Sequence, residues 1–189
     1  MNQRKAGEDF YFLHKIIPFR SFARITDCSV YPSGRSSDRV PFGTGHAVNK
    51  SVHATCKTYY TYNPNIYIEI KVWIDTIKSA STENILQIDK LSRSIQDFLI
   101  REKFPSVNEN FFKQFKTAQA YQEAIFRWFN GFRMLKLVHY LRDKDYINIQ
   151  INLACQKLWQ MLEGKTEVHS NFDWLMHYRN KEKSIDVNS

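Results

Sequence analysis

Cysteine is scarce in this sequence, and its scarcity bears on the compartment in which the protein is found. The 189 residues include three cysteines, Cys28, Cys56 and Cys155. A small secreted protein that relies on disulfides has an even and usually larger number of cysteines. The sequence therefore predicts a protein of a reducing compartment, and we expect a cytoplasmic location.

Long apolar runs are absent. No stretch of 18 consecutive apolar residues occurs, so the sequence predicts neither a membrane-spanning helix nor a membrane partner. The first ten residues are polar and include Glu8 and Asp9, so they lack the apolar core of a secretory signal. With 43% hydrophobic and 24% charged residues, the chain has a globular composition, which excludes wholly disordered and collagen-like chains.

Acidic residues are outnumbered by basic ones. The 27 Lys and Arg residues exceed the 19 Asp and Glu residues, which gives a formal net charge of +8. Residues 1–60 hold nine bases against four acids, and residues 109–142 hold six bases against two acids. Such an excess favours nucleic acid or another polyphosphate as the partner.

The clearest periodicity in the chain is typical of a β-strand. Over residues 66–74, apolar β-branched side chains occupy every second position, which would place one set on each face of a strand. Residues 52–62 are also rich in β-forming types, and residues 63–65 are typical of a turn. The sequence therefore predicts a hairpin in a β-rich part over residues 1–78, with a long loop at residues 32–45.

After residue 78 the apolar positions recur with a helical period, which predicts a helical part over residues 79–180. A first helix is expected to begin at Ser81 and to end before Pro105. A second is expected to begin with a capping box at residues 106–109 and to continue to a break at residues 130–131.

Two further helices are expected nearer the C-terminus. One runs from about Tyr146 to Glu163 and ends at Gly164, although the isoleucines at the start of this segment also alternate as in a strand. The other is short and capped by Ser170, and residues 181–189 are expected to form a frayed tail.

The segregation of strands and helices predicts an α+β fold. We expect one compact domain, in which an N-terminal antiparallel sheet with long loops is followed by a C-terminal bundle of three to four helices packed on it. Residues 11–17 form a short apolar run that fits either a strand or a helical turn.

One face of the predicted hairpin combines aromatic and basic side chains. If residues whose numbers sum to 126 pair with each other, that face carries His53, Thr55, Lys57 and Tyr59 beside Tyr67, Glu69, Lys71 and Trp73. Aromatic planes stack on bases and cations bind phosphates, so the face is a candidate platform for RNA or single strands. The alternative is an ordinary solvated face, or one that helices cover.

The first functional hypothesis is therefore a nucleic-acid-binding protein, which can also be a subunit of a larger complex. Stacking is assigned to Tyr59, Tyr67 and Trp73. Lys113, Lys116 and Arg127 would lie along one helix face and track a phosphate backbone. The residues assigned to phosphate contacts are Arg35, Arg39, Lys50, Lys57, Lys71, Lys113, Lys116 and Arg127.

Two alternatives remain open. In the first, the protein is a nuclease or another enzyme acting on a phosphodiester or nucleotide, with His46 or His53 as the general base. A pair of Arg133 and His139, with five residues between them on a predicted helix, fits the same class, since such a pair occurs in some dimeric ribonucleases. In the second alternative, the protein is an interaction module without nucleic acid, whose aromatic helix surfaces bury against a protein partner.

The sequence predicts neither a metal nor a cofactor. Cys28, His46, His53 and Cys56 are zinc-ligand types, but they do not form two closely spaced pairs. The Gly43–Thr44–Gly45 segment lacks the strand–loop–helix pattern of a phosphate-cradling loop.

Overall fold

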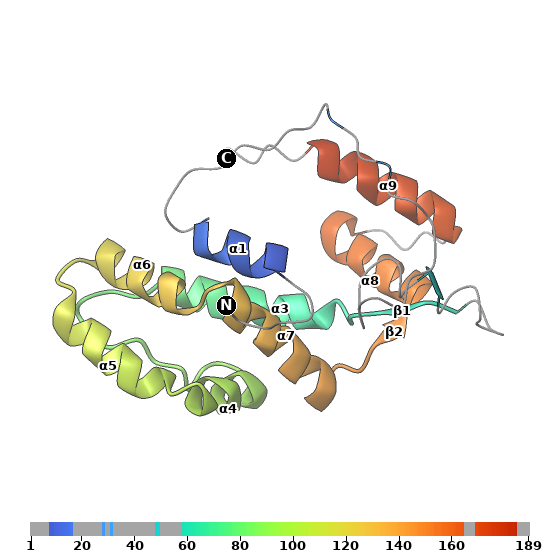
Figure 1. Ribbon diagram of the computed structural model, residues 1–189. Coiled ribbons are helices and arrows are strands. Elements are labelled where there is room, and N and C mark those ends of the chain that lie inside the picture. The colour runs from blue at the N-terminus through green and yellow to red at the C-terminus, as the bar shows by residue number, and fades with distance from the viewer. Residues whose placement is uncertain are drawn as a thin grey trace. The chain divides into compact units, whose positions relative to one another are not determined.

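The computed structural model shows a mostly helical chain with a small two-stranded antiparallel sheet (Figure 1). The chain divides into two compact units, residues 60–168 and residues 1–59 with 169–189. None of the described helices is long and apolar enough to cross a membrane. The structure describes residues 8–16, 28, 31, 48–49, 58–164 and 169–184.

Residues 60–168 contain most of the described elements. Among them, α3 packs against α6 and α7, α4 packs against α5 and α7, and α8 contacts the two strands. The elements are β1 (Tyr60–Thr61), α3 (Asn65–Lys78), α4 (Arg93–Arg101), α5 (Phe104–Gln114), α6 (Ala118–Trp128), α7 (Gly131–Lys144), β2 (Ile149–Gln150) and α8 (Ile151–Glu163).

The predicted strand over residues 66–74 is wrong, because this segment lies within helix α3. The alternating pattern also contains a helical stripe, since Ile66, Ile70, Trp73 and Ile77 follow one another at intervals of four, three and four residues. These four side chains are buried, whereas Ile68, which the strand would bury, is exposed. Burial of the stripe decides the conformation.

The predicted turn begins a helix instead of joining two strands. Proline is tolerated at the start of a helix, and Pro64 occupies the N-cap of α3. The side chain of Asn63 supports it by accepting from the backbone N–H of Asn65 at 3.1 Å. Of the predicted pairing partner, residues 52–62, residues 52–57 lie outside the described residues, and Tyr60 and Thr61 pair with another segment.

The sheet that does form joins distant parts of the chain. Strand β1 pairs antiparallel with β2, with Tyr60 opposite Gln150 and Thr61 opposite Ile149. The alternating isoleucines before α8 therefore reflect a short strand, and the helix begins at Ile151 instead of about Tyr146. The predicted end is confirmed, because Gly164 caps α8 with a φ of 67°, a conformation that favours glycine.

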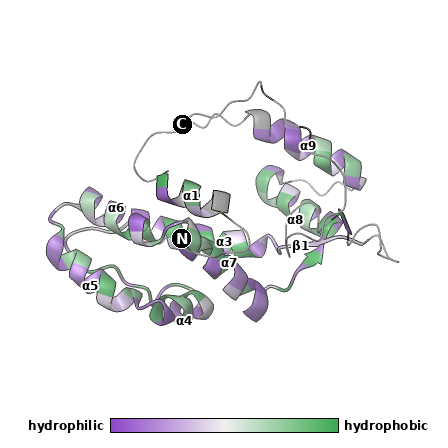
Figure 2. Ribbon diagram, viewed as in Figure 1, coloured by the Kyte–Doolittle hydropathy of each residue, from purple (hydrophilic) through white to green (hydrophobic). Residues whose placement is uncertain are grey.

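Aromatic rings form the centre of the core between α3, α5 and α6. Trp73 is fully buried and meets Phe104 edge-on at 5.3 Å between ring centroids and Phe129 at 5.9 Å. Phe104 also packs on Trp128 at 4.8 Å. Such pairs add to the free energy of area burial, so this cluster helps to hold α3 in the core. Figure 2 shows that these helices combine hydrophobic and hydrophilic residues, as amphipathic elements do.

The helix predicted from Ser81 begins later, at Arg93. Residues 81–92 run as an irregular segment, and buried polar side chains satisfy part of its backbone. Asn108 donates to the carbonyl of Leu86 at 2.9 Å, and the Leu86 N–H donates to the hydroxyl of Tyr121 at 3.2 Å. The Tyr121 hydroxyl in turn donates to Asn108. This closed network fixes the segment to α5 and α6.

The single helix predicted from residue 106 to residue 130 is two helices. The capping box at residues 106–109 does not form, because α5 already begins at Phe104. The helix ends at Gln114, and α6 starts after Thr117, whose hydroxyl accepts from the Ala120 N–H.

The predicted break at residues 130–131 is confirmed. Asn130 caps α7 by accepting from the N–H groups of Phe132 and Arg133, both at 3.1 Å. The break orients α7 independently of α6 and lets its apolar stripe of Leu137, Val138 and Leu141 face the core.

The other unit contributes two described helices. The first, α1 (Glu8–Ile16), shows that residues 11–16 of the ambiguous N-terminal run are helical. The second, α9 (Asn171–Ser184), has the predicted cap, since the Ser170 hydroxyl accepts from the Asp173 N–H while the Asp173 carboxylate accepts from Ser170. This helix includes residues 181–184 of the predicted tail.

Candidate functional site

The aromatic platform predicted on the hairpin does not form. Trp73 is fully buried among core rings, so it is not available to stack on a base. Tyr67 and Lys71 lie on the exposed side of α3, and Tyr59 is also exposed. In a helix, residues two apart point in different directions, and the face that a strand would assemble is therefore dispersed.

The histidines assigned to catalysis and half of the assigned cations lie outside the described residues. The structure therefore leaves these assignments as predictions. The residues concerned are Arg35, Arg39, His46, Lys50, His53 and Lys57.

Of the four assigned cations that the structure describes, Lys71 is neutralised locally. Its ammonium group lies 2.5 Å from the Asp75 carboxylate, one turn along α3. Lys113, Lys116 and Arg127 are exposed, and none of the three forms an ion pair among the described residues. The three remain available to a polyanion.

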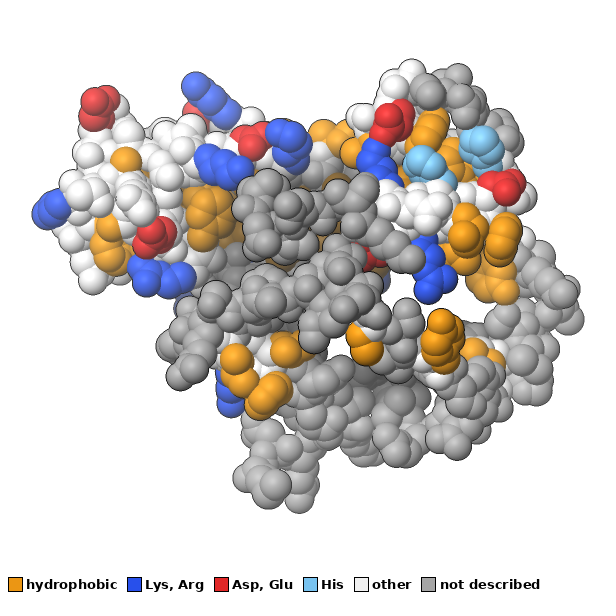
Figure 3. All heavy atoms as spheres, turned by 90° about the horizontal axis from the view of Figure 1, so that it is seen from above, with side chains coloured by type: hydrophobic (Ala, Val, Ile, Leu, Met, Phe, Trp, Pro, Cys, Tyr) orange, Lys and Arg blue, Asp and Glu red, His pale blue; other side chains and the backbone are white. Residues whose placement is uncertain are grey.

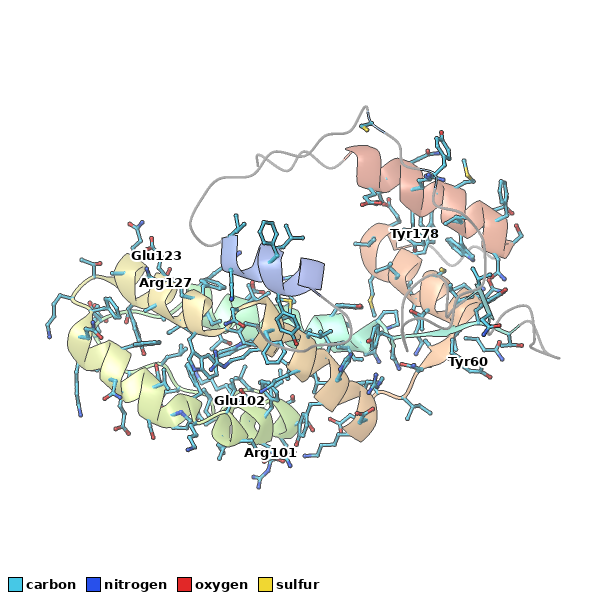
Figure 4. The ribbon with its side chains drawn as sticks, in the orientation of Figure 1. Tyr60, Arg101, Glu102, Glu123, Arg127 and Tyr178 are labelled. Atoms are coloured by element: carbon cyan, nitrogen blue, oxygen red, sulfur yellow. The ribbon has the colours of Figure 1, made fainter. Side chains whose placement is uncertain are left out.

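The prediction that these three cations follow one helix face is wrong, because the helix is broken at residues 115–117. Lys113 lies in the last turn of α5, and Lys116 lies in the connection, where its ammonium donates to the Lys113 carbonyl at 2.8 Å. Arg127 lies in the last turn of α6, one turn after Glu123 (Figure 4). The basic positions therefore lie at two separate places on the pair of helices α5 and α6, here called the α5–α6 hairpin: the connection between the helices and the end of α6.

Elsewhere in the unit, acids and bases are mixed. Figure 3 shows Lys and Arg side chains interspersed with Asp and Glu on the face it presents. Asp97 binds both Arg93 at 3.2 Å and Lys144 at 2.7 Å, and its hydrogen bond from Lys144 lowers the pKa of the carboxyl group. Such exposed pairs contribute little stability but cancel the field of the cations involved.

A second cluster of polar groups lies where the C-terminal half of α7 meets the start of α3. His139, Arg142 and Asp143 lie on α7 at a spacing of three and four residues from the histidine, so they share one side of the helix, and Tyr146 follows just after its end. The hydroxyl of Tyr62 lies 2.9 Å from Nε2 of His139, and the two rings are stacked at an interplanar angle of 22°.

The neighbouring Arg142 forms a two-pronged ion pair with Asp143. Its Nε lies 2.6 Å from Oδ1, and its Nη2 lies 2.9 Å from Oδ2. This hydrogen bonding raises the pKa of Arg142, with a smaller contribution from Tyr62, and lowers the pKa of Asp143. Both groups are therefore charged throughout the neutral pH range.

A surface depression of about 320 Å³ opens beside this pair. Its lining consists of Arg142, Asp143, Ile147 and Asn148. The lining thus offers a guanidinium group, a carboxylate, an amide and an aliphatic side chain to a ligand. None of these four residues belongs to the site that the sequence predicted, because single polar residues at the end of a helix have no distinctive spacing.

Tyr146 connects this cluster to α3. Its hydroxyl donates to Oε1 of Glu69 at 2.8 Å and so connects the end of α7 to α3. Burial, together with this hydrogen bond and the charge of Glu69, raises the pKa of Tyr146 to about 12. The hydroxyl therefore stays protonated at neutral pH and acts as a structural donor.

Arg133 and His139, the pair suggested by the sequence, contact different neighbours. Arg133 lies 4.5 Å above the Trp128 ring and pairs with Glu102, whereas His139 bonds to Tyr62. Figure 4 locates Glu102 at the C-terminal end of α4. The described chain therefore does not bring the two side chains into one site.

No group of three or more metal-ligating side chains occurs among the described residues. Of the cysteines, Cys28 is exposed, whereas Cys155 is half-buried, and burial raises the pKa of its thiol. The chain as a whole matches no family model, no curated protein and no solved structure.

Proposed function

We propose that this protein binds nucleic acid, with a preference for RNA or single strands. The observation that carries the proposal is the set of exposed cations on the α5–α6 hairpin, Lys113, Lys116 and Arg127, which form no ion pair among the described residues. A cation without an acidic partner binds a phosphate more readily, because no carboxylate has to be displaced from it first.

The overall charge supports the same proposal. An ion pair neutralises one charge of each sign, so the net charge of +8 remains on the chain whichever pairs form, and the largest excess lies in residues 1–60. Tyr59 and Tyr67 are 49% and 51% exposed, so each offers an aromatic plane for stacking on a base. A preference for single strands follows, because bases inside a duplex are not accessible to such planes.

The test is a salt-titrated binding assay against RNA, single-stranded DNA and duplex DNA. We expect the logarithm of the affinity to fall linearly with the logarithm of the salt concentration. Replacing Lys113, Lys116 and Arg127 together by Gln should make this slope shallower by about 0.7–0.9 for each phosphate that the variant no longer binds. Lys71→Gln is the matched control, since Lys71 is an exposed helix cation that Asp75 already neutralises.

The proposal is contradicted if the wild-type chain binds none of these nucleic acids, or binds them with an affinity that salt does not change. Analysis of the strands recovered from the same tubes distinguishes binding from cleavage. Shortened products would favour the alternative of an enzyme acting on phosphodiesters, and His46→Ala and His53→Ala would then test the assigned general base.

A protein partner is the second candidate function. It is favoured by large apolar side chains that remain exposed at and around α8, among them Ile147, Leu153 and Leu162. Light scattering on the purified chain tests it, because such surfaces favour self-association when their partner is missing. A monodisperse monomer that binds nucleic acid would argue against this function.

A further inference from the structure

The depression at the end of α7 combines the groups that a nucleotide requires. A nucleotide presents a phosphate, which a planar guanidinium group binds with two parallel hydrogen bonds. It also presents a planar base with apolar faces and polar edges. The depression offers a group for each of these features: Arg142 for the phosphate, Ile147 for an apolar face of the base and Asn148 for its polar edge.

The guanidinium group of Arg142 can exchange its partner. In the structure it binds Asp143, whose side chain is 65% exposed. An ion pair with a partner this exposed contributes little stability, so a phosphate that offers the same two-pronged geometry can displace the carboxylate. Asp143 therefore acts as an internal competitor for the anion.

The base-binding side of the depression is apolar and open. Ile147 is 75% exposed, so its aliphatic surface is open to a ligand. Asn148 offers an amide donor and acceptor next to it, and such groups read the polar edge of a base. The depression of about 320 Å³ is open to solvent, so it can contact one side of a nucleotide without enclosing it.

We infer that this depression binds one nucleotide unit, with the phosphate on Arg142 in place of Asp143 and the base against Ile147 and Asn148. The choice of ligand rests on the proposed nucleic-acid function. The unit can come from a free nucleotide or from a strand, since both present the same chemistry.

The experiment compares the binding of AMP, inorganic phosphate and a short single-stranded RNA by the wild-type chain and two variants. Arg142→Ala should weaken the binding of AMP by about tenfold, the loss expected for charge-assisted hydrogen bonds. Asp143→Asn should strengthen it by about threefold, because the competitor loses its charge. Phosphate alone should bind more weakly than AMP, since it lacks the base.

Controls separate binding from folding. Thermal unfolding of each variant shows whether the chain remains folded, and Arg142→Lys, which keeps the charge but loses the planar fork, should bind between wild type and Arg142→Ala. Lys78→Gln removes an exposed cation at the C-terminal end of α3 and should leave the affinity for AMP unchanged.

The outcomes distinguish the two proposals. If RNA binds but Arg142→Ala and Asp143→Asn match the wild type with every probe, the nucleotide site is wrong and the nucleic-acid function stands. If AMP binds with the expected opposite changes but RNA does not bind, the site stands for free nucleotides and the nucleic-acid function is wrong. If neither probe binds, both are wrong.

Discussion

Two arginines on α7 have the same exposure but different contacts: one binds neighbouring helices, and the other binds a residue of its own helix. The side chains of Arg133 and Arg142 are each 29% exposed, and each pairs with a carboxylate. Arg133 also donates to the Trp128 carbonyl at 2.6 Å and lies over the Trp128 ring, so its contacts join α7 to α6 and α4. Arg142 pairs with its own neighbour in the chain and lines a depression.

The difference shows what distinguishes a structural arginine from one available to a ligand. The deciding feature is whether its carboxylate partner lies on another helix or on the same helix, more than how deeply the arginine is buried. Glu102, the partner of Arg133, is itself 20% exposed and also binds Lys136 at 3.0 Å. Displacing it would break contacts between helices. Displacing Asp143 from Arg142 breaks only a contact within one helix. The packed side of the bundle and the open end of α7 should therefore respond differently to substitution.

The largest effect is expected on the packed side, from Trp73→Ala. Removing a fully buried indole from the aromatic centre should lower the free energy of unfolding by about 3–5 kcal/mol. Chemical denaturation measures this decrease. Tyr67→Ala on the exposed side of the same helix is the control and should cost far less. Equal costs for the two variants would indicate that residues 66–74 do not form the helix described.

A smaller effect is expected from Tyr121→Phe, which tests the buried polar network of the same region. The variant keeps the ring but leaves the Leu86 N–H and Oδ1 of Asn108 without their partner. An unsatisfied buried group costs about 1–3 kcal/mol. Hydrogen exchange at Leu86 should also accelerate. Unchanged stability and exchange would show that residues 81–92 are held by their apolar contacts alone.

At the open end of α7, the contribution of Tyr146 to stability should be lost at high pH. The folded pKa of Tyr146 is about 12, above its usual value of 10.0, because of burial and the nearby Glu69. The corresponding stability is fully present below pH 10 and is lost as the pH rises through about 12, since the unfolded chain releases this proton first. An ultraviolet titration of phenolate in wild type and Tyr146→Phe measures it. Ionisation of Tyr146 near pH 10 would contradict the contact.

Part of the fold could be predicted from local chemistry. The break before α7, the glycine at the end of α8 and the serine cap of α9 were all predictable, because each depends on a residue and its immediate neighbours. The conformation of α3 was not. Its isoleucines satisfy a period of two and a helical stripe at once, and only the burial of Trp73 against Phe104 and Phe129 selects the helix.

The candidate site depended on the same choice. The predicted platform required a strand; once α3 is a helix, Trp73 lies in the core while Tyr67 and Lys71 stay on the exposed side. The exposed cations of the α5–α6 hairpin could be identified as basic positions, but whether they form ion pairs depends on tertiary structure. The depression beside Arg142 could not be predicted, because it brings together a helix end and the residues that follow it by folding alone.

The most direct measurement is a crossed comparison of Arg133→Ala and Arg142→Ala, in which the free energy of unfolding and the affinity for single-stranded RNA are both determined. Arg133→Ala should lower stability by about 1–2 kcal/mol, since it removes a charged hydrogen bond and ring contact that are partly exposed, and should leave the affinity unchanged. Arg142→Ala should keep stability within about 0.5 kcal/mol of wild type while RNA binding weakens. If both variants lose stability and neither changes the affinity, the two ends of α7 do not differ in role, and the proposed ligand site is wrong.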